Sequence, residues 1–334
     1  MSDEDAKPMR VLVTGASGFL GSHVADLLAE RGHTVRALVR ATSRTTHLQS
    51  IGAEIAIASL ETGAGLDDAL DGVDAIVHSA GVVKARTAED FHQVNVGGTI
   101  HLLDAAERMN TPLERFVFIS SLAAHGFSQD GAPRSVDAPA QPVTHYGRSK
   151  MAAEEEVRQR AERLAVSVIR PPAIYGPRDG EMFNFFKMVK MGLRGYMGSP
   201  DNTLSLIYGP DCAQAVYLTL TKPHPSGSVF FVEDGRVYTQ REFGQIVADS
   251  LGVSGIDVAV PMPILRAAAA GSELWGKLSG KAVMLTRDKV NELREPYLVC
   301  SSADIRETLG WQPEVQLEEG ARRCVAWYRQ EGWL

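Results

Sequence analysis

Short apolar runs alternate with amphipathic stretches along the first half of this 334-residue chain. Residues 11–13 predict a buried strand, and residues 19–28 follow with the spacing of an amphipathic helix. Further strands are predicted at residues 34–39, 54–59, 74–78 and 115–120. Each strand is separated from the next by a stretch long enough for a right-handed helical crossover, which predicts an α/β fold with a doubly wound parallel sheet.

The pattern changes beyond residue 172, where a second group of elements begins. Residues 228–232 predict a strand that could return to the edge of the first sheet. A further strand is predicted at 204–208, and helices are predicted at 183–193, 211–221, 240–251, 264–279 and 317–330. The stretch 264–279 is apolar enough to touch a lipid surface, but it lacks a basic face, so we expect an ordinary packed helix there.

Three glycines, Gly15, Gly18 and Gly21, fall on the turn between the first strand and the first helix. A side chain at Gly15 would block the tight turn, one at Gly18 would hold the backbone away from a pyrophosphate, and one at Gly21 would push the helix off the sheet. The helix N-terminus adds free N–H groups and positive partial charge. The turn therefore predicts a dinucleotide-phosphate site, and we assign Ser17, Phe19 and Leu20 to the cofactor as well.

The glycine turn and the change of pattern beyond residue 172 together predict two parts of the chain. A dinucleotide-binding domain of the Rossmann type is expected at residues 9–172, with returns near 204–221 and 228–232. A smaller, partly interleaved C-terminal substrate-binding lobe is expected at residues 173–203 and 233–334.

The tip of the second predicted strand is Arg40, at the position that faces the adenine ribose in a dinucleotide fold. An acidic residue there accepts hydrogen bonds from the 2′-hydroxyl of NAD, whereas an arginine pairs with the 2′-phosphate of NADP. No acidic residue lies between Glu30 and Glu54, while Arg40, Ser43 and Arg44 can all reach a phosphate. The sequence therefore predicts NADP (NADPH) as the cofactor, with NAD less favoured.

Composition narrows the range of partners. The chain has 34 basic and 41 acidic residues, a balance of −7, which gives no electrostatic footprint for nucleic acid. Cys212, Cys300 and Cys324 are scattered, so neither a disulfide framework nor a metal site is predicted. Residues 1–9 do not resemble a secretory signal, and no apolar run of about 18 residues could span a bilayer. We expect a cytoplasmic protein with a small-molecule substrate, no nucleic-acid partner and no stable membrane insertion.

A tyrosine and a lysine stand four residues apart at Tyr146 and Lys150, so both lie on one face at the start of a helix. Ser121 ends the fifth strand, where strand ends of such sheets line the ligand crevice. Hydride transfer to a carbonyl needs an acid for the developing alkoxide, and a phenol with a pKa of about 10 needs a nearby cation to act as a base at neutral pH. Lys150 can supply that cation. His78 and His125 are expected to be structural, because the acid/base role is filled.

Together with Asn95 in the run VNVGGT and the run RPPAIYGP that starts at Arg170, these residues resemble the extended short-chain dehydrogenase/reductase family, of the epimerase/dehydratase type. The resemblance covers nearly the whole chain and is greatest to the hydroxysteroid-dehydrogenase-like and dihydroflavonol-reductase-like branch. It implies that Tyr146 is the acid/base, that Lys150 also holds the nicotinamide ribose, that Ser121 hydrogen-bonds the substrate oxygen and that Asn95 holds a proton-relaying water. We prefer Ser121 to its neighbour Ser120 on spacing.

Further cofactor contacts are assigned to Ser59 and Leu60 after the third predicted strand and to Ser79, Ala80 and Gly81 after the fourth. Pro171, in the run RPPAIYGP, is assigned to the cofactor as well. Many relatives carry an acidic residue that binds adenine where this chain has Ser59 and Leu60. Dehydratases of the family place an Asp-Glu pair directly after the strand-five hydroxyl residue, and this chain has Leu122 and Ala123, so an elimination lacks its acid and base.

The substrate region also departs from the sugar-nucleotide enzymes. Epimerases of the family often show an asparagine before Tyr-Gly-Pro that touches the substrate pyrophosphate, whereas this chain has Pro172, Ala173 and Ile174 at that place. The apolar run 182–188, which we expect to enter the substrate pocket, also indicates a less charged ligand.

The sequence predicts an NADP-dependent reductase or dehydrogenase that transfers a hydride between nicotinamide and a ketone or secondary alcohol of a fairly hydrophobic small molecule. One alternative is a sugar-nucleotide 4-epimerase with retained NAD, and a second is a non-catalytic, NADP-sensing binding protein. The predicted helices at 88–109 and 150–164 resemble the pair that forms a four-helix dimer interface in the family, so we expect a homodimer.

Overall fold

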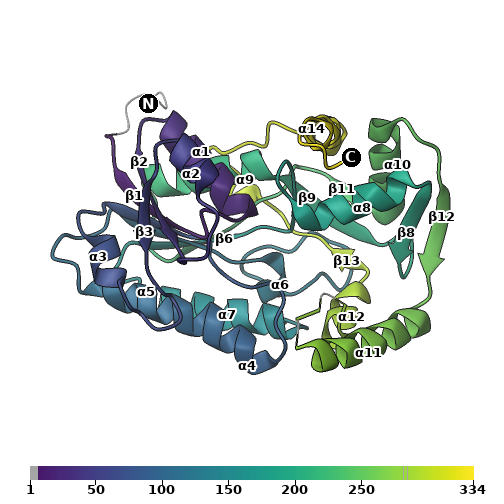
Figure 1. The fold of residues 1–334 in the computed structure, drawn as a ribbon, viewed down its shortest axis with the longest axis horizontal. Helices are drawn as coiled ribbons and strands as arrows, with labels where there is room; N and C mark the ends of the chain where they lie inside the picture. Colours follow the sequence, from purple (N-terminus) through teal and green to yellow (C-terminus); the bar gives the residue numbers. More distant parts are fainter. Residues whose placement is uncertain (1–6, 281, 284) are drawn as a thin grey trace.

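The computed structural model of the protein describes residues 7–280, 282–283 and 285–334. Its larger layer is a seven-stranded sheet with the order β10-β6-β5-β4-β1-β2-β3, in which neighbouring strands run parallel (Figure 1). The strands are β1 (Arg10–Thr14), β2 (Thr34–Val39), β3 (Glu54–Ile57), β4 (Ala75–His78), β5 (Arg115–Ile119), β6 (Val166–Arg170) and β10 (Ser228–Phe231). The strand order reverses between β1 and β4, so the predicted doubly wound α/β sheet is confirmed.

Side chains of the central strands alternate between two apolar cores, one on each face of the sheet. Val11 and Val13 belong to the core under α1 (Phe19–Glu30) and α9 (Gly209–Thr221), and Leu12 belongs to the opposite one. The opposite core is covered by α3 (Leu66–Leu70), α5 (Gly98–Glu107) and α7 (His145–Arg158). Figure 1 shows α1 and α9 on one side of the sheet and α5 and α7 on the other. The short helix α2 (Thr46–Ser50) follows β2.

Two predicted helices differ from the observed ones. The stretch 88–109 is not one helix, because α4 (Ala88–Phe91) passes into a π-helical turn, η2 (His92–Gly97), before α5 begins. The helix predicted from residue 150 begins at His145, because the Thr144 side chain accepts a hydrogen bond from Gly147 N–H and caps α7. Strand β6 was not predicted at all, although it is buried in the large sheet.

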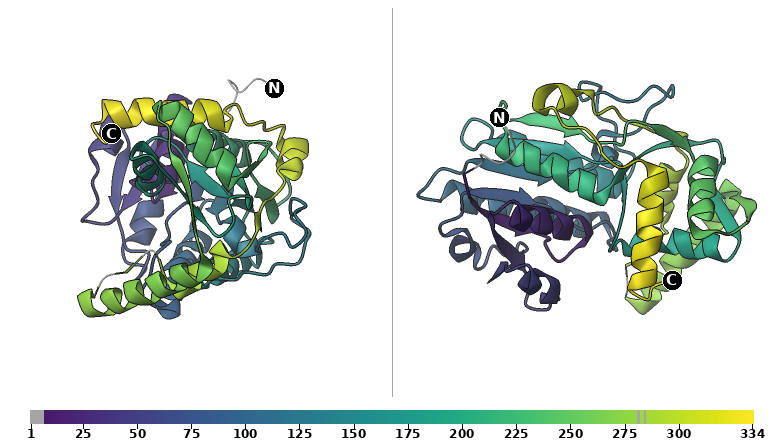
Figure 2. Two further views of the ribbon diagram at one scale, coloured as in Figure 1. Left: turned by 90° about the vertical axis from the view of Figure 1, so that its right-hand side faces the viewer. Right: turned by 90° about the horizontal axis from the view of Figure 1, so that it is seen from above.

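The second half of the chain forms a smaller lobe with its own core. A four-stranded sheet contains β7 (Ala173–Tyr175), β9 (Thr203–Tyr208), β11 (Val237–Thr239) and β13 (Tyr297–Leu298), and β8 (Leu193–Met197) pairs with β12 (Ile256–Val260). The helices of this lobe are α8 (Gly180–Lys190), α10 (Gln240–Leu251), α11 (Met262–Ser279), α12 (Arg287–Leu293) and α14 (Leu317–Gln330). Helix α13 (Ala303–Leu309) instead packs on the large sheet, beside α9 and β10. Figure 2 shows this lobe beside the large sheet, with α14 along one margin.

The expectation that the apolar run 182–188 enters a substrate pocket is corrected by the packing of α8. Phe183 lies against Tyr328, with 4.8 Å between ring centroids, and Phe185 stacks on Phe243 at 4.7 Å. Phe186 is fully buried in the same cluster. These rings face α14 and α10, so they build the core of the smaller lobe.

The segment 204–221 contributes to both layers. Strand β9 pairs with strands of the small sheet, whereas α9 packs against the core beside α1. Strand β10 pairs with β6 at the edge of the large sheet. The proposed division into a cofactor domain and a substrate lobe stays a prediction.

Helix α11 departs from the ordinary packed helix that we expect. Its inner side chains Leu265 and Ala269 are buried, but Leu274, Trp275 and Leu278 are exposed. In the left view of Figure 2, α11 runs along the margin of the molecule. Among the described residues, no helix is both long and apolar enough to cross a bilayer.

Candidate active site

The glycine turn after β1 is shaped so that only glycines fit at two of its positions. Gly15 has φ +69°, and a Cβ built on it would lie 2.9 Å from the Ala80 nitrogen. A Cβ on Gly21 would lie 2.2 Å from the Gly15 carbonyl oxygen, so it would strike the turn itself and not the sheet. Gly18 is the N-cap residue of α1, and no side chain caps the free N–H groups of the helix there. The free N–H groups of this helix end and the bare backbone beside them fit a pyrophosphate.

The loop after β4 connects this turn with the candidate catalytic lysine. Ala80 contacts Gly15, as described, and its N–H donates to Thr14 Oγ1 at 3.1 Å. A Cβ on Gly81 would lie 3.1 Å from Asn95 Oδ1 and 3.9 Å from Lys150 Nζ. Residues 79–81 therefore lie between the glycine turn and Lys150, at the point where the strand order reverses and open α/β sheets bind ligands.

A neutral chain of hydrogen bonds runs beneath this loop. Thr14 Oγ1 and His78 Nδ1 are 2.7 Å apart, and His78 Nε2 and Thr99 Oγ1 are 2.9 Å apart. Thr99 Oγ1 donates to the Asn95 carbonyl, so it accepts from His78, which assigns the proton to Nε2. Burial, with the charge of Lys150, lowers the pKa of His78 to about 3. His78 therefore stays neutral and has the structural position that we expect.

Asn95 joins the β4 loop to the catalytic helix through its side chain. Its Oδ1 accepts from Val82 N–H at 2.8 Å, and its Nδ2 donates to Val82 O at 3.1 Å and to Ser149 Oγ at 2.9 Å. Ser149 Oγ in turn donates to the Tyr146 carbonyl. Both amide protons of Asn95 are used in these contacts, and its expected role in holding a water stays a prediction.

The structure brings Ser121 and Tyr146 together at the carboxyl end of β5. Ser121 precedes α6 (Leu122–His125), and its Oγ accepts from Ala123 N–H at 3.2 Å. Burial raises the pKa of Tyr146 to about 12, although its hydrogen bond with Ser121 acts in the opposite direction. The carboxylates of Glu292 and Glu181 raise this pKa further. The phenol is thus protonated throughout the neutral pH range.

Lys150 lies on the same face of α7 but points toward the sheet. Its Nζ donates to the Ile119 carbonyl at 2.6 Å and lies 4.1 Å from the centroid of the Phe118 ring. Burial lowers the pKa of this amine to about 7, while the charge of Glu154 acts to raise it. Burial dominates the pKa of the Tyr146 phenol, and the Lys150 amine is held at Ile119. The expected role of Lys150 as the cation beside the phenol stays a prediction.

The hydroxyl of Ser120, the neighbour of Ser121, belongs to a buried ionic network. Ser120 Oγ donates to Glu154, which pairs with Arg170 at 2.6 Å, and both charged side chains are almost fully buried. Arg170 Nη1 donates to His125 Nδ1 at 2.9 Å. Burial and the charges of Arg170 and Arg134 lower the pKa of His125 to about 4, so this imidazole is neutral. Ser120 is thus committed to Glu154, whereas Ser121 reaches Tyr146.

The remaining predicted cofactor residues lie around the same sheet edge. Arg40 and Arg44 are exposed after β2, and neither side chain forms an ion pair with another described residue. Ser43 Oγ accepts from Arg40 N–H at 3.2 Å. Leu60, in the turn after β3, accepts from His101 through its carbonyl, and the Pro171 carbonyl accepts from Leu122 N–H. Ser17 is exposed on the glycine turn, and Phe19 packs beside Gly209.

The smaller lobe contributes charged groups that the sequence did not indicate. Asp288 of α12 accepts from His145 N–H at 2.8 Å, which fixes α12 over the start of α7. Lys84, in the loop after β4, pairs with Glu181 of α8 at 2.7 Å. Glu181 and Glu292 both act on Tyr146. No spacing in the sequence could indicate these contacts, because they form only when separate elements pack together.

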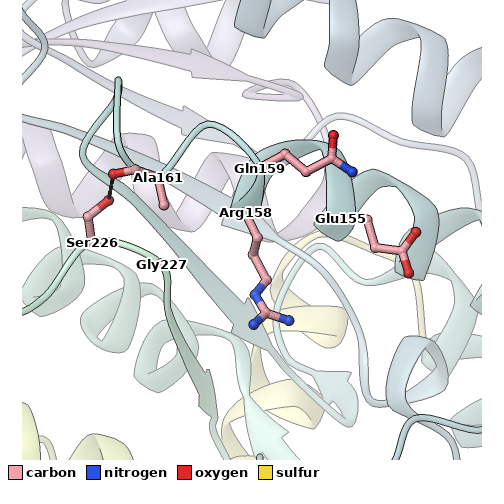
Figure 3. A pocket seen from close by; sticks show the side chains of 6 residues that line it. All are labelled: Glu155, Arg158, Gln159, Ala161, Ser226 and Gly227. Carbon is pink, nitrogen blue, oxygen red and sulfur yellow. Dashed lines mark hydrogen bonds between the residues drawn. The ribbon is translucent and has the colours of Figure 1, made fainter.

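A separate hollow of about 460 Å³ lies at the opposite edge of the large sheet (Figure 3). It is lined by Glu155, Arg158, Gln159, Ala161, Ser226 and Gly227. Gly227 N–H donates to the carbonyl of Val166, where β6 begins, whereas Ser121 follows the other end of β5. The hollow therefore lies away from the residues that could do chemistry, and we place the candidate active site at the carboxyl edge.

Comparison with known proteins adds the following similarities. Residues 11–232 match the model of the NAD dependent epimerase/dehydratase family. The chain is 31% identical to a ceramide reductase of Caulobacter vibrioides, over 97% of this chain and 96% of that protein. It is 29% identical to a 2-alkyl-3-oxoalkanoate reductase of Stenotrophomonas maltophilia, over 95% and 99% of the two chains.

The fold is shared with a solved epimerase. The crystal structure of UDP-glucuronic acid 4-epimerase from Bacillus cereus in complex with NAD superposes with a TM-score of 0.78. The match covers 97% of this chain and 99% of that one, at 19% identity. This likeness concerns the architecture alone.

Proposed function

The chain belongs to the NAD dependent epimerase/dehydratase family, the extended short-chain dehydrogenases/reductases, and from this premise we propose that it is an NADP-preferring ketone reductase. Its substrate would be a ketone, or in reverse a secondary alcohol, of a fairly hydrophobic small molecule. The observation that carries this proposal is the meeting of Ser121 and Tyr146, with Lys150 one turn further along α7, at the edge that also holds the glycine turn.

The protonation state of Tyr146 supports the direction of reduction. A bound nicotinamide cofactor would supply or accept the hydride. Tyr146, with its pKa raised to about 12 by burial, is an acid that retains its proton at neutral pH and can give it to a developing alkoxide. The Ser121 hydroxyl, beside the phenol, can donate to the same substrate oxygen. Oxidation of an alcohol needs the phenolate and is therefore expected to be favoured only at alkaline pH.

Relatives support the substrate class. The ceramide reductase and the 2-alkyl-3-oxoalkanoate reductase are named for reductions of molecules with apolar chains.

The residues after Ser121 disfavour a dehydratase. Leu122 and Ala123 are buried there in an apolar cluster, so no carboxylate stands at these positions to serve an elimination.

NADP preference is supported by the tip of β2. Arg40 and Arg44 have exposed side chains without an ion pair in the described part of the chain, so both can meet a 2′-phosphate. We expect Arg40→Asp to weaken NADPH binding by roughly 10- to 100-fold, since a charge-assisted hydrogen bond is lost, and to change NADH binding far less. Arg158→Asp makes the same charge change at the hollow in Figure 3 and should leave both affinities unchanged. Equal loss of NADPH and NADH binding would contradict the assignment.

The first experiment is a screen of ketones against NADPH oxidation, with the cofactor content of the purified protein measured beside it. A reductase exchanges its cofactor, so denatured protein should release little nicotinamide dinucleotide. The alternative, a sugar-nucleotide 4-epimerase, retains NAD through both half-reactions and would release it in stoichiometric amount. A cofactor-sensing binding protein would bind NADPH yet reduce none of the ketones.

A homodimer is proposed through the outer face of α5 and α7, which lie side by side below the sheet (Figure 1). The proposal depends on the family resemblance of these two helices. Sedimentation at micromolar concentration should find twice the monomer mass, and a monomer alone would contradict the proposal. The cytoplasmic location also stays a prediction.

A further inference from the structure

Helix α11 has an apolar face that no described part of the chain covers. The exposed fractions are 58% for Ile264, 60% for Leu274, 66% for Trp275 and 77% for Leu278. Leu274 and Trp275 stand four and three residues before Leu278. Ile264 stands fourteen residues, about four turns, before Leu278, so all four side chains share one side of the helix. The opposite side holds Leu265 and packs on α12. The helix is therefore apolar on two sides, and only one of them is buried.

Charge favours a lipid surface as the occupant of the outer face. Residues 262–294 contain six basic and three acidic residues, a balance of +3, whereas the rest of the chain has a balance of −10. Arg266 and Lys277 are exposed on α11 itself, and its one acidic residue, Glu273, is paired with Arg287 at 2.8 Å. Anionic lipid attracts such a segment. A second copy would bring the same positive segment against itself, which disfavours pairing of two chains through this face.

The helix is also joined directly to the candidate active site. Val290 of α12 packs against Leu265 and Ala269 of α11. Asp288 of the same α12 accepts from His145 N–H, and Glu292 acts on Tyr146. The pair α11–α12 thus extends from the catalytic tyrosine to the uncovered apolar face. A surface that holds α11 would lie on the α12 side of the candidate active site.

We propose that the outer face of α11 docks on an anionic lipid bilayer, from which the enzyme takes its substrate. The indole of Trp275 suits the interface, where its ring is buried and its N–H stays hydrated. The helix would lie in the plane of the headgroups, as amphipathic helices do. The docking surface is independent of the chemistry, but the origin of the substrate rests on the proposed ketone reduction.

The test is co-sedimentation of the full chain with vesicles of phosphatidylcholine and phosphatidylglycerol in equal parts. The triple variant Leu274→Glu/Trp275→Glu/Leu278→Glu should reduce the bound fraction at least tenfold. A matched control, Met191→Glu/Val237→Glu/Ile256→Glu, changes three other exposed apolar side chains of the same lobe and should bind as the unaltered protein does. The single variant Leu278→Glu, at the most exposed position, gives a milder test if the triple variant does not fold.

Self-association and ketone reduction, measured beside vesicle binding, distinguish the ways in which the proposal could fail. Absence of vesicle binding by the unaltered protein, or equal binding by the triple variant, would overturn the proposal. Loss of self-association in the triple variant without vesicle binding would assign the face to a second copy and would also overturn it. If vesicles bind but no ketone is reduced, the docking surface stands and the proposed function fails. The triple variant should still reduce a water-soluble ketone with NADPH.

Discussion

The large sheet and the smaller lobe use buried and charged groups differently. At the edge of the sheet, Thr14, His78 and Thr99 form a neutral hydrogen-bonded chain, and Glu154 and Arg170 form a buried ion pair. In the lobe, the charged groups nearest the site, Glu181 and Glu292, are only partly covered or exposed. The difference teaches that the sheet holds the candidate catalytic groups in fixed positions, while the lobe adjusts the electrostatics of Tyr146 through Glu181 and Glu292.

The largest effect is expected at Tyr146, on the sheet side of this comparison. Tyr146→Phe removes the proton donor and should lower kcat for ketone reduction by about 10²- to 10⁴-fold. NADPH affinity, measured by fluorescence titration, should change little. Tyr217→Phe removes a hydroxyl in α9, away from the site, and should leave both quantities unaltered. Undiminished turnover in Tyr146→Phe would remove the tyrosine from the acid/base role.

The next largest effect is expected on stability, from the buried ion pair of Glu154 and Arg170. Glu154→Gln leaves the buried Arg170 guanidinium without its counter-charge and should lower the free energy of unfolding by about 3–5 kcal/mol. The neighbouring exposed residue serves as the control, since Glu155→Gln removes the same charge from the surface. Chemical denaturation of both variants measures the difference. Equal stability of the two would mean that the pair does not hold α7 to β6.

The neutral chain through His78 predicts a dependence of stability on pH. The pKa of His78 is about 3 in the folded protein and about 6.5 when unfolded, so the unfolded state binds more protons between these values. The unfolding free energy should therefore fall as pH falls below 6.5, by about 2 kcal/mol at pH 5 from this group.

Substitution of His78 isolates the contribution of its imidazole to the pH dependence of the unfolding free energy. His78→Gln keeps an amide donor and acceptor near Thr14 and Thr99 but cannot titrate, so its stability should fall less steeply with acid. His92→Gln changes an exposed histidine and should retain the original slope. Identical slopes in all three proteins would show that His78 does not titrate differently on folding.

The smallest effect is expected from the lobe. The Glu292 carboxylate raises the pKa of Tyr146, so Glu292→Gln should lower that pKa. In the direction of alcohol oxidation, which needs the phenolate, the alkaline rise of kcat should move to lower pH by less than about one unit. Glu307→Gln in α13 is the distant control. A shift to higher pH would mean that Glu292 does not face the phenol.

Much of the sheet and of its edge could be predicted from sequence. Strand β2 begins and ends at the expected residues, because four of its six residues are apolar and only Arg36 interrupts them. Strand β6 is not predicted, and the burial of its last residue, Arg170, depends on Glu154 from another element, which no local pattern indicates. Tyr146 and Ser121 are predicted from local signals, a spacing and a strand end, and the structure brings the two side chains together. Their catalytic roles stay predictions.

The lobe was less predictable for a physical reason. Periodicity indicates that Phe183 and Phe185 need an apolar neighbour, but it cannot tell a substrate from α14 or α10. Helix α12 is short and polar, so it gives no pattern, and its contact with His145 arises only from tertiary packing. The same limit applies to α11, whose two apolar sides are alike in sequence and differ only in what covers them.

The central claim, net hydride transfer from an exchangeable cofactor, is tested most directly with NADPH that carries deuterium at the transferable position of the nicotinamide ring. After incubation with a ketone that the enzyme consumes, mass spectrometry of the product should find deuterium on the new alcohol carbon, with one NADP⁺ formed per alcohol. A product without deuterium, or turnover without net NADP⁺, would contradict the reductase assignment.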